Sequence, residues 1–115
     1  MDKHMAERLA RAAYNINVVQ KRNNEEAYKK RVHEIKQIFS RANQQYEQIK
    51  LNYKIGKLNK GQVYKMLSEL RNDLNMSYNN ISSGRIKAEF SISYMLLIDK
   101  IDTVLGIDIN GEFEF

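Results

Sequence analysis

The feature that most constrains the fold is an unbroken heptad pattern between Glu25 and Ile55. Apolar and aromatic residues alternate at spacings of four and three, at Tyr28, Val32, Ile35, Phe39, Ala42, Tyr46, Ile49 and Tyr53. In an α-helix this spacing gathers the side chains into one narrow stripe, and no proline or glycine interrupts it. At about 1.5 Å per residue the helix is about 45 Å long, so other elements can pack along it. The pattern predicts an all-α protein organised around one long helix.

A lighter seam precedes the main one within residues 2–22, at Met5, Leu9, Ala12, Ile16 and Val19. The step from Val19 to Tyr28 is nine residues, which does not continue the heptad. Asn23 followed three residues later by Glu26 matches a capping box, which marks helix starts. We therefore expect a separate N-terminal helix with a break near Asn23. A single continuous helix is the alternative.

Two further helices are predicted after Gly56, which can take the left-handed conformation that ends a helix. Asn59 with Gln62 forms a capping box for a helix with apolar residues at Val63, Leu67, Leu70, Leu74, Tyr78 and Ile81. Ser82 or Ser83 can cap the next helix, which runs to about Leu105. We expect residues 1–106 to form an antiparallel bundle of three long helices, with the N-terminal helix packed on them or extending to a partner.

The last predicted helix is apolar on two sides. Its main face includes Ile86, Phe90, Tyr94, Leu97, Ile98, Ile101, Val104 and Leu105, and a second strip holds Ile92, Met95 and Leu96 beside Ala88. A helix with two apolar sides is buried between layers or contacts another chain. We therefore interpret Ile92, Met95 and Leu96 as candidate partner-binding residues, and we expect a homodimer.

Residues 107–115 alternate apolar and polar side chains around Asn110-Gly111, which predicts a β-hairpin or an extended tail. In a strand, Phe113 and Phe115 project to one side and the neighbouring glutamates to the other. Two interpretations stay open. The phenylalanines cover the end of the bundle, or they bind a partner, through a sheet edge or a basic pocket.

The net charge of +5 is unevenly distributed. Residues 1–57 hold 13 Lys and Arg against 6 acidic residues, and residues 58–115 hold 6 against 8. A cluster of cations is a candidate contact for nucleic acid or another anion, at Lys21, Arg22, Lys29, Lys30 and Arg31. Glu25 and Glu26 lie among these cations and weaken their field.

No pattern for catalysis or metal binding is present. The chain has no cysteine and only two histidines, His4 and His33, and it lacks a nucleophile elbow and a glycine-rich phosphate loop. The pairs Glu25–Glu26 and Asp99–Asp102 fall on predicted polar faces. We expect no catalytic residue, metal or cofactor.

The sequence therefore predicts a non-enzymatic protein–protein interaction module: an adaptor, inhibitor or assembly factor that acts as a homo-oligomer. A nucleic-acid-binding regulator is the alternative. The N-terminus alternates charged and apolar residues, unlike a secretory signal. The apolar run 94–98 is too short to span a bilayer. We expect a cytoplasmic protein that does not bind membranes.

Overall fold

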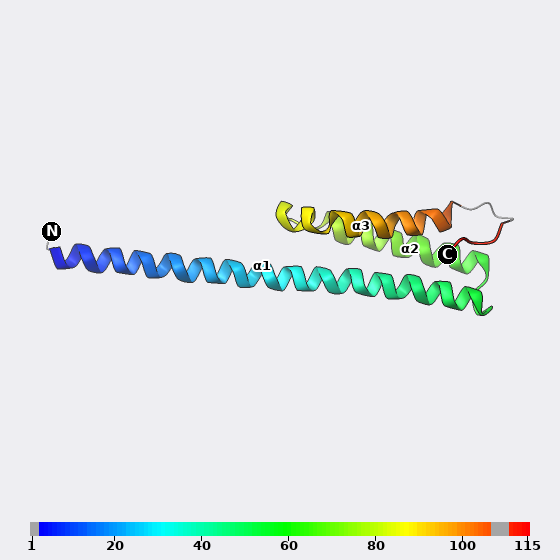
Figure 1. Ribbon diagram of the computed structural model, residues 1–115, viewed down its shortest axis with the longest axis horizontal. Coiled ribbons are helices and arrows are strands. Elements are labelled where there is room, and N and C mark those ends of the chain that lie inside the picture. Colours follow the sequence, from blue (N-terminus) through cyan, green and yellow to red (C-terminus); the bar gives the residue numbers. More distant parts are fainter. Residues whose placement is uncertain (1–2, 107–110) are drawn as a thin grey trace. The chain divides into compact units, whose positions relative to one another are not determined.

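The computed structural model describes residues 3–106 and 111–115, and three α-helices account for 86% of this part (Figure 1). They are α1 (Lys3–Lys54), α2 (Lys60–Asn79) and α3 (Gly84–Leu105). No strand occurs among the described residues, so the all-α prediction is confirmed. The contacts divide the chain into two compact units, Met1–Ile35 and Lys36–Phe115. The predicted domain division at residue 106 stays a prediction.

The predicted break near Asn23 is wrong, because α1 is continuous from Lys3 to Lys54. No proline or glycine lies between these residues, so no backbone group has to leave the helical hydrogen-bond pattern. An asparagine inside a helix costs less than about 1 kcal/mol, whereas a break leaves four amides and four carbonyls without helical partners. A capping box favours a helix start, but it does not end the helix that precedes it.

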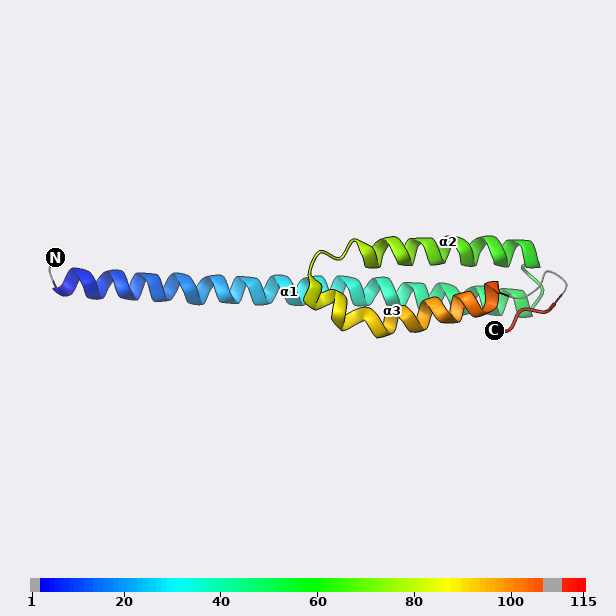
Figure 2. The same cartoon turned by 90° about the horizontal axis from the view of Figure 1, so that it is seen from above.

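The unit Lys36–Phe115 is an antiparallel three-helix bundle, as predicted. The C-terminal part of α1, α2 and α3 lie side by side in both views (Figures 1 and 2). Its core consists of Phe39, Ala42, Tyr46, Ile49, Val63, Leu67, Leu70, Leu74, Ile81, Ile86, Phe90, Leu97, Ile98, Ile101 and Val104. The rings of Phe39 and Phe90 stack at a centroid distance of 5.5 Å and join α1 to α3. The predicted seams supply this core, but Ile81 lies in the connection between α2 and α3 and not on a helix as predicted.

Short connections with the predicted turn chemistry join the helices. Gly56, in the connection after α1, has φ +80°, a conformation that favours glycine. The Asn59 side chain accepts from the backbone amide of Gln62 at 2.8 Å, and the Gln62 side chain accepts from the amide of Asn59 at 2.9 Å. Ser83 caps α3 by accepting from the amide of Ile86 at 3.3 Å. These caps keep both loops short and the neighbouring helices antiparallel.

The predicted C-terminal hairpin is not supported. Residues 107–110, including Asn110 of its turn, lie outside the described residues, and residues 111–115 form no strand. Phe113 and Phe115 are instead half-buried against aromatic residues of α1. An isolated two-stranded hairpin is marginal in water. Burial of the Phe113 and Phe115 rings on the bundle therefore determines the path of the tail more than hairpin formation does.

Candidate functional site

The exposed large apolar side chains include two regular rows on helices. We call Met5, Leu9, Ala12, Ile16 and Val19 of α1 the N-terminal strip, and Ala88, Ile92, Met95 and Leu96 of α3 the α3 strip. Leu9 and Ile16 are 57% and 58% exposed, and Ile92 and Leu96 are 71% and 65% exposed. These rows are the candidate interaction surfaces.

The N-terminal strip belongs to the unit Met1–Ile35. A helix turns by about 100° per residue, so the 13 residues from Val19 to Val32 place these side chains about 140° apart around the axis. Val32 and Ile35 are buried, whereas the strip lies on another side of α1 and is exposed. The sequence predicted that the N-terminal helix packs on the bundle or extends to a partner, but it did not single out these residues as a binding surface. The nine-residue step between the two seams could have identified this exposed strip. In a continuous helix that step moves the apolar side chains to another side, although it was interpreted as a break.

The α3 strip belongs to the unit Lys36–Phe115 and lies opposite the buried face of its helix. Ile92 follows the buried Phe90 by two residues, which corresponds to about 200° around the helix. The structure brings the predicted residues Ile92, Met95 and Leu96 together on one exposed face, and Met95 is 60% exposed. The exposed residues Arg85 and Asp99 lie at the two ends of this face. Their partner-binding role stays a prediction.

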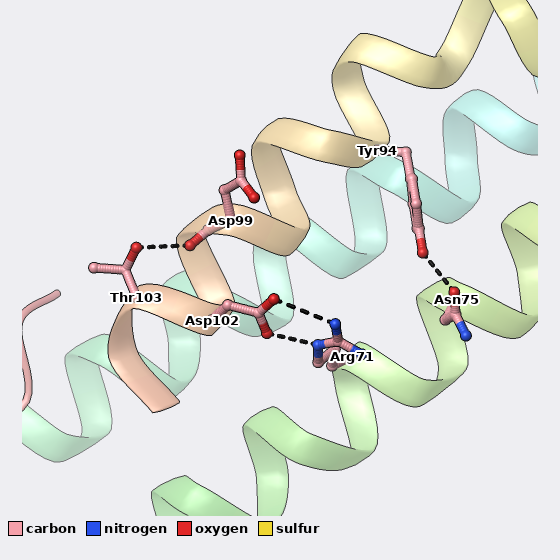
Figure 3. A network of polar contacts seen from close by, with 6 residues as sticks. All are labelled: Arg71, Asn75, Tyr94, Asp99, Asp102 and Thr103. Carbon is pink, nitrogen blue, oxygen red and sulfur yellow. Dashed lines mark hydrogen bonds and ion pairs between the residues drawn. The ribbon is translucent and has the colours of Figure 1, made fainter. Parts of the chain in front are cut away.

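A network of polar contacts joins α2 to α3 (Figure 3). The Arg71 guanidinium donates from Nε and Nη2 to the two carboxylate oxygens of Asp102, at 2.6 and 3.2 Å. This hydrogen-bonded pair raises the pKa of Arg71 above its usual value. The Tyr94 hydroxyl donates to Oδ1 of Asn75 at 2.6 Å. The network therefore holds two helices together.

The two carboxylates of the pair Asp99–Asp102 have different surroundings. Asp102 is held by Arg71, whereas the Asp99 carboxylate points away from that ion pair in Figure 3. Thr103 donates its hydroxyl proton to the backbone carbonyl of Asp99 at 2.7 Å. Both carboxylates are on exposed residues. Acid–base catalysis by two carboxyls is typical of a cleft, whereas this pair lies on an exposed helix surface.

The tail residues Phe113 and Phe115 lie on aromatic side chains of α1. The Phe113 ring meets Tyr53 edge-on at 5.2 Å, and the Phe115 ring meets Tyr46 edge-on at 5.8 Å. The Tyr53 hydroxyl donates to Glu112 at 2.6 Å, which is the main reason that the pKa of Tyr53 is raised. These contacts favour the interpretation that the tail covers the bundle end. Partner binding by the two phenylalanines stays a prediction.

The basic cluster of α1 is exposed, and its side chains leave the helix in several directions. Lys29, Lys30 and Arg31 are consecutive, so their side chains leave the helix about 100° apart. Lys21 and Arg22 diverge in the same way, and Arg31 lies 3.2 Å from Glu34 in an ion pair. Phosphate binding needs several cations on one side of a helix. Arg22 and Lys29 are seven residues apart and share one side of the helix, whereas the other cations of the cluster point elsewhere. A nucleic-acid contact at these residues stays a prediction.

In residues 3–106 and 111–115, no group of three or more His, Cys, Asp or Glu residues could hold a metal ion. None of the helices in these ranges has the length and apolar character needed to cross a membrane. Comparisons with models of known protein families, with curated proteins and with solved structures find no match to this chain.

Proposed function

We propose that the chain is a non-enzymatic protein-binding module, an adaptor, inhibitor or assembly factor that binds another protein and forms homo-oligomers. The observation that carries this proposal is the regular row of exposed apolar side chains on α1. Met5, Leu9, Ile16 and Val19 repeat at heptad spacing, and each is more than half exposed. Single exposed apolar residues are common on protein surfaces, whereas contiguous patches mark interaction sites.

The N-terminal strip has the form that a helical partner or an apolar groove recognises. Side chains spaced four and three apart act as knobs that a second helix surrounds, or as anchors in a groove. Arg8 immediately precedes Leu9, and Arg22 lies one turn beyond Val19. These cations favour a partner with carboxylates beside its apolar surface, because opposite charges at the rim select partners and speed association.

The chain contains no cysteine, which fits a reducing compartment. We therefore place this binding in the cytoplasm as part of the proposal. Salt-dependent binding to DNA or RNA, abolished by neutralising Lys29 and Lys30, would favour the nucleic-acid alternative, because phosphate contacts weaken steeply as salt rises.

The test is isolation of the full chain, with its bound protein, from cells that make it naturally. We expect Leu9→Glu with Ile16→Glu to remove the bound protein, because two charges placed about two turns apart on the strip prevent its burial. The matched control is Tyr14→Glu. Tyr14 is 69% exposed and lies about 180° from the centre of the strip on the same helix. Equal recovery of the bound protein with the unmodified chain, with Leu9→Glu plus Ile16→Glu and with Tyr14→Glu would contradict the proposal.

A further inference from the structure

A groove runs between α1 and α2 on the surface of the bundle. It consists of two adjoining hollows that share Gln45, Leu70 and Asp73 in their lining. On α1 the lining extends from Ile38 to Asn52, 14 residues later, which is about 21 Å or four helical turns. Its floor is formed by buried core residues, Leu70 among them. The bundle therefore presents an elongated groove with an apolar floor.

The α2 wall of this groove is acidic. Glu69 and Asp73 line it, and both residues are exposed. They lie four residues apart on one face of α2, where like charges destabilise a helix. In the part of the chain that the structure describes, neither carboxylate has an ion pair. Arg41 is the one cation among the described lining residues, and Lys65, one turn before Glu69, does not line the groove, so the wall favours a cationic occupant.

The N-terminal strip has the matching length and the opposite charge. From Met5 to Val19 it also extends over 14 residues, about 21 Å. The charged residues nearest to it are cations on one flank, with Arg8 about 60° and Arg22 about 100° from the centre of the strip. Within this stretch the one acidic residue is Glu7, about 160° away around α1. The strip is therefore an apolar row with one basic flank.

We propose that the N-terminal strip of one copy lies in the groove between α1 and α2 of a second copy, with its basic flank against the acidic wall of α2. The three-helix bundle then gains a fourth helix, whose side chains at spacings of four and three enter the groove. The strip and one wall of the groove both belong to α1, and a continuous helix cannot pack against itself. The contact therefore forms only between copies, and each copy provides one strip and one groove.

Pairing of two N-terminal strips fits the charges less well. It would bring together two flanks that carry cations, so Arg8 and Arg22 would gain no carboxylate partner. Glu69 and Asp73 would also keep their mutual repulsion. The contact between strip and groove places these opposite charges side by side, and complementary charges at a rim select one partner over another.

This inference rests on the proposed function, since it names the partner of the N-terminal strip. The experiment is sedimentation velocity on the full chain, from micromolar concentrations upward. We expect association that increases with concentration. The strip variant, Leu9→Glu with Ile16→Glu, should be monomeric because its charges prevent burial of the strip. The groove variant, Glu69→Lys with Asp73→Lys, should raise the dissociation constant about tenfold, because attraction to the basic flank becomes repulsion.

A mixture of the two variants tests the pairing directly. The groove variant keeps an intact strip, and the strip variant keeps an intact groove. At a concentration where each variant alone is monomeric, an equimolar mixture should therefore form a complex of two chains. Two strips cannot form this complex, because one of the two chains has no intact strip.

Controls separate these results from a loss of folding. All four substituted residues are exposed, so circular dichroism should show undiminished helix in both variants. Glu69→Gln with Asp73→Asn keeps the size of both side chains and should weaken association less; it replaces the groove variant if that chain loses helix. Asp99→Lys reverses an exposed charge on α3 and should leave association unchanged.

Three outcomes overturn the pairing of strip and groove. They are a monomer at every concentration of the unmodified chain, a folded groove variant that associates as strongly as the unmodified chain, and a mixture of the two variants that stays monomeric. Isolation of a different protein through the N-terminal strip would still support the proposed function in each case, so the two failures are distinguishable.

Discussion

Replacing Phe39 with alanine tests whether the long seam of α1 is the centre of the core. The Phe39 side chain is 8% exposed and stacks on Phe90 with an angle of 4° between the ring planes. Truncation of a buried phenylalanine costs about 3–5 kcal/mol, from lost apolar burial and from the cavity left behind. Stacked rings contribute about 0.5–1.5 kcal/mol beyond their burial. We therefore expect Phe39→Ala to remove about 3–5 kcal/mol from the free energy of unfolding.

This loss is a large part of the stability of a small domain, which is about 5–15 kcal/mol. Urea unfolding followed by far-UV circular dichroism measures it, at one fixed protein concentration because self-association adds stability. Phe39→Leu retains part of the apolar volume, so it should give a smaller loss if the alanine variant does not fold. The control is Met76→Ala on α2, which removes a side chain that is 63% exposed and should change stability by less than about 0.5 kcal/mol.

A double-mutant cycle with Phe90→Ala isolates the ring pair. If the rings interact as the structure shows, the two losses are not additive, and the coupling free energy is about 0.5–1.5 kcal/mol. A loss below about 0.5 kcal/mol for Phe39→Ala alone would refute the reasoning. It would mean that Phe39 is at the surface and that α1 does not pack on α3 at this position.

Three further outcomes are expected. Deletion of residues 111–115 should lower stability, because burial of one phenylalanine contributes about 1.5–3 kcal/mol; an unchanged melting temperature would contradict the capping role. Glu112→Gln should lower the pKa of Tyr53 in a spectrophotometric titration, since its raised pKa comes mainly from this hydrogen bond; the stabilising effect of the bond is present below pH 10 and is lost as the pH rises through the raised pKa. Asp102→Asn should cost only about 0–1 kcal/mol in urea unfolding, because its ion pair with Arg71 is partly exposed; a loss above about 3 kcal/mol would indicate a buried pair.

The core was predictable from the sequence because helical period alone decides which side chains share a face. Six of the eight seam residues of α1, from Val32 to Ile49, are buried, and Tyr28 and Tyr53 at its ends are half-buried. The turns were predictable for a similar reason, since Gly56 and the Asn59–Gln62 box act within a few residues. Each of these signals is local, and no competing interaction opposes it.

The failures have a different physical origin. The break near Asn23 was inferred from a capping box and from the nine-residue step between the seams, but a cap adds stability only where other forces end a helix. The tail followed its aromatic contacts to Tyr46 and Tyr53 on α1, and these depend on tertiary placement. The Arg71–Asp102 pair joins residues on two helices, and the sequence offers many other pairings of opposite charge. The residues of the α3 strip could be named from sequence, whereas their exposure depends on which helices cover them.

The polar network of Figure 3 has a consequence for the relative position of α2 and α3 along their axes. Leucine and isoleucine layers can slide by one helical turn, about 5.4 Å, and still find apolar neighbours. The two hydrogen bonds between Arg71 and Asp102 and the bond from Tyr94 to Asn75 cannot survive that shift. The exposed ion pair contributes little to stability, and a single part-buried hydrogen bond contributes about 0.5–1.5 kcal/mol. Together they distinguish one helix register from its neighbours, so their removal should produce a bundle that is nearly as stable but no longer unique in its alignment.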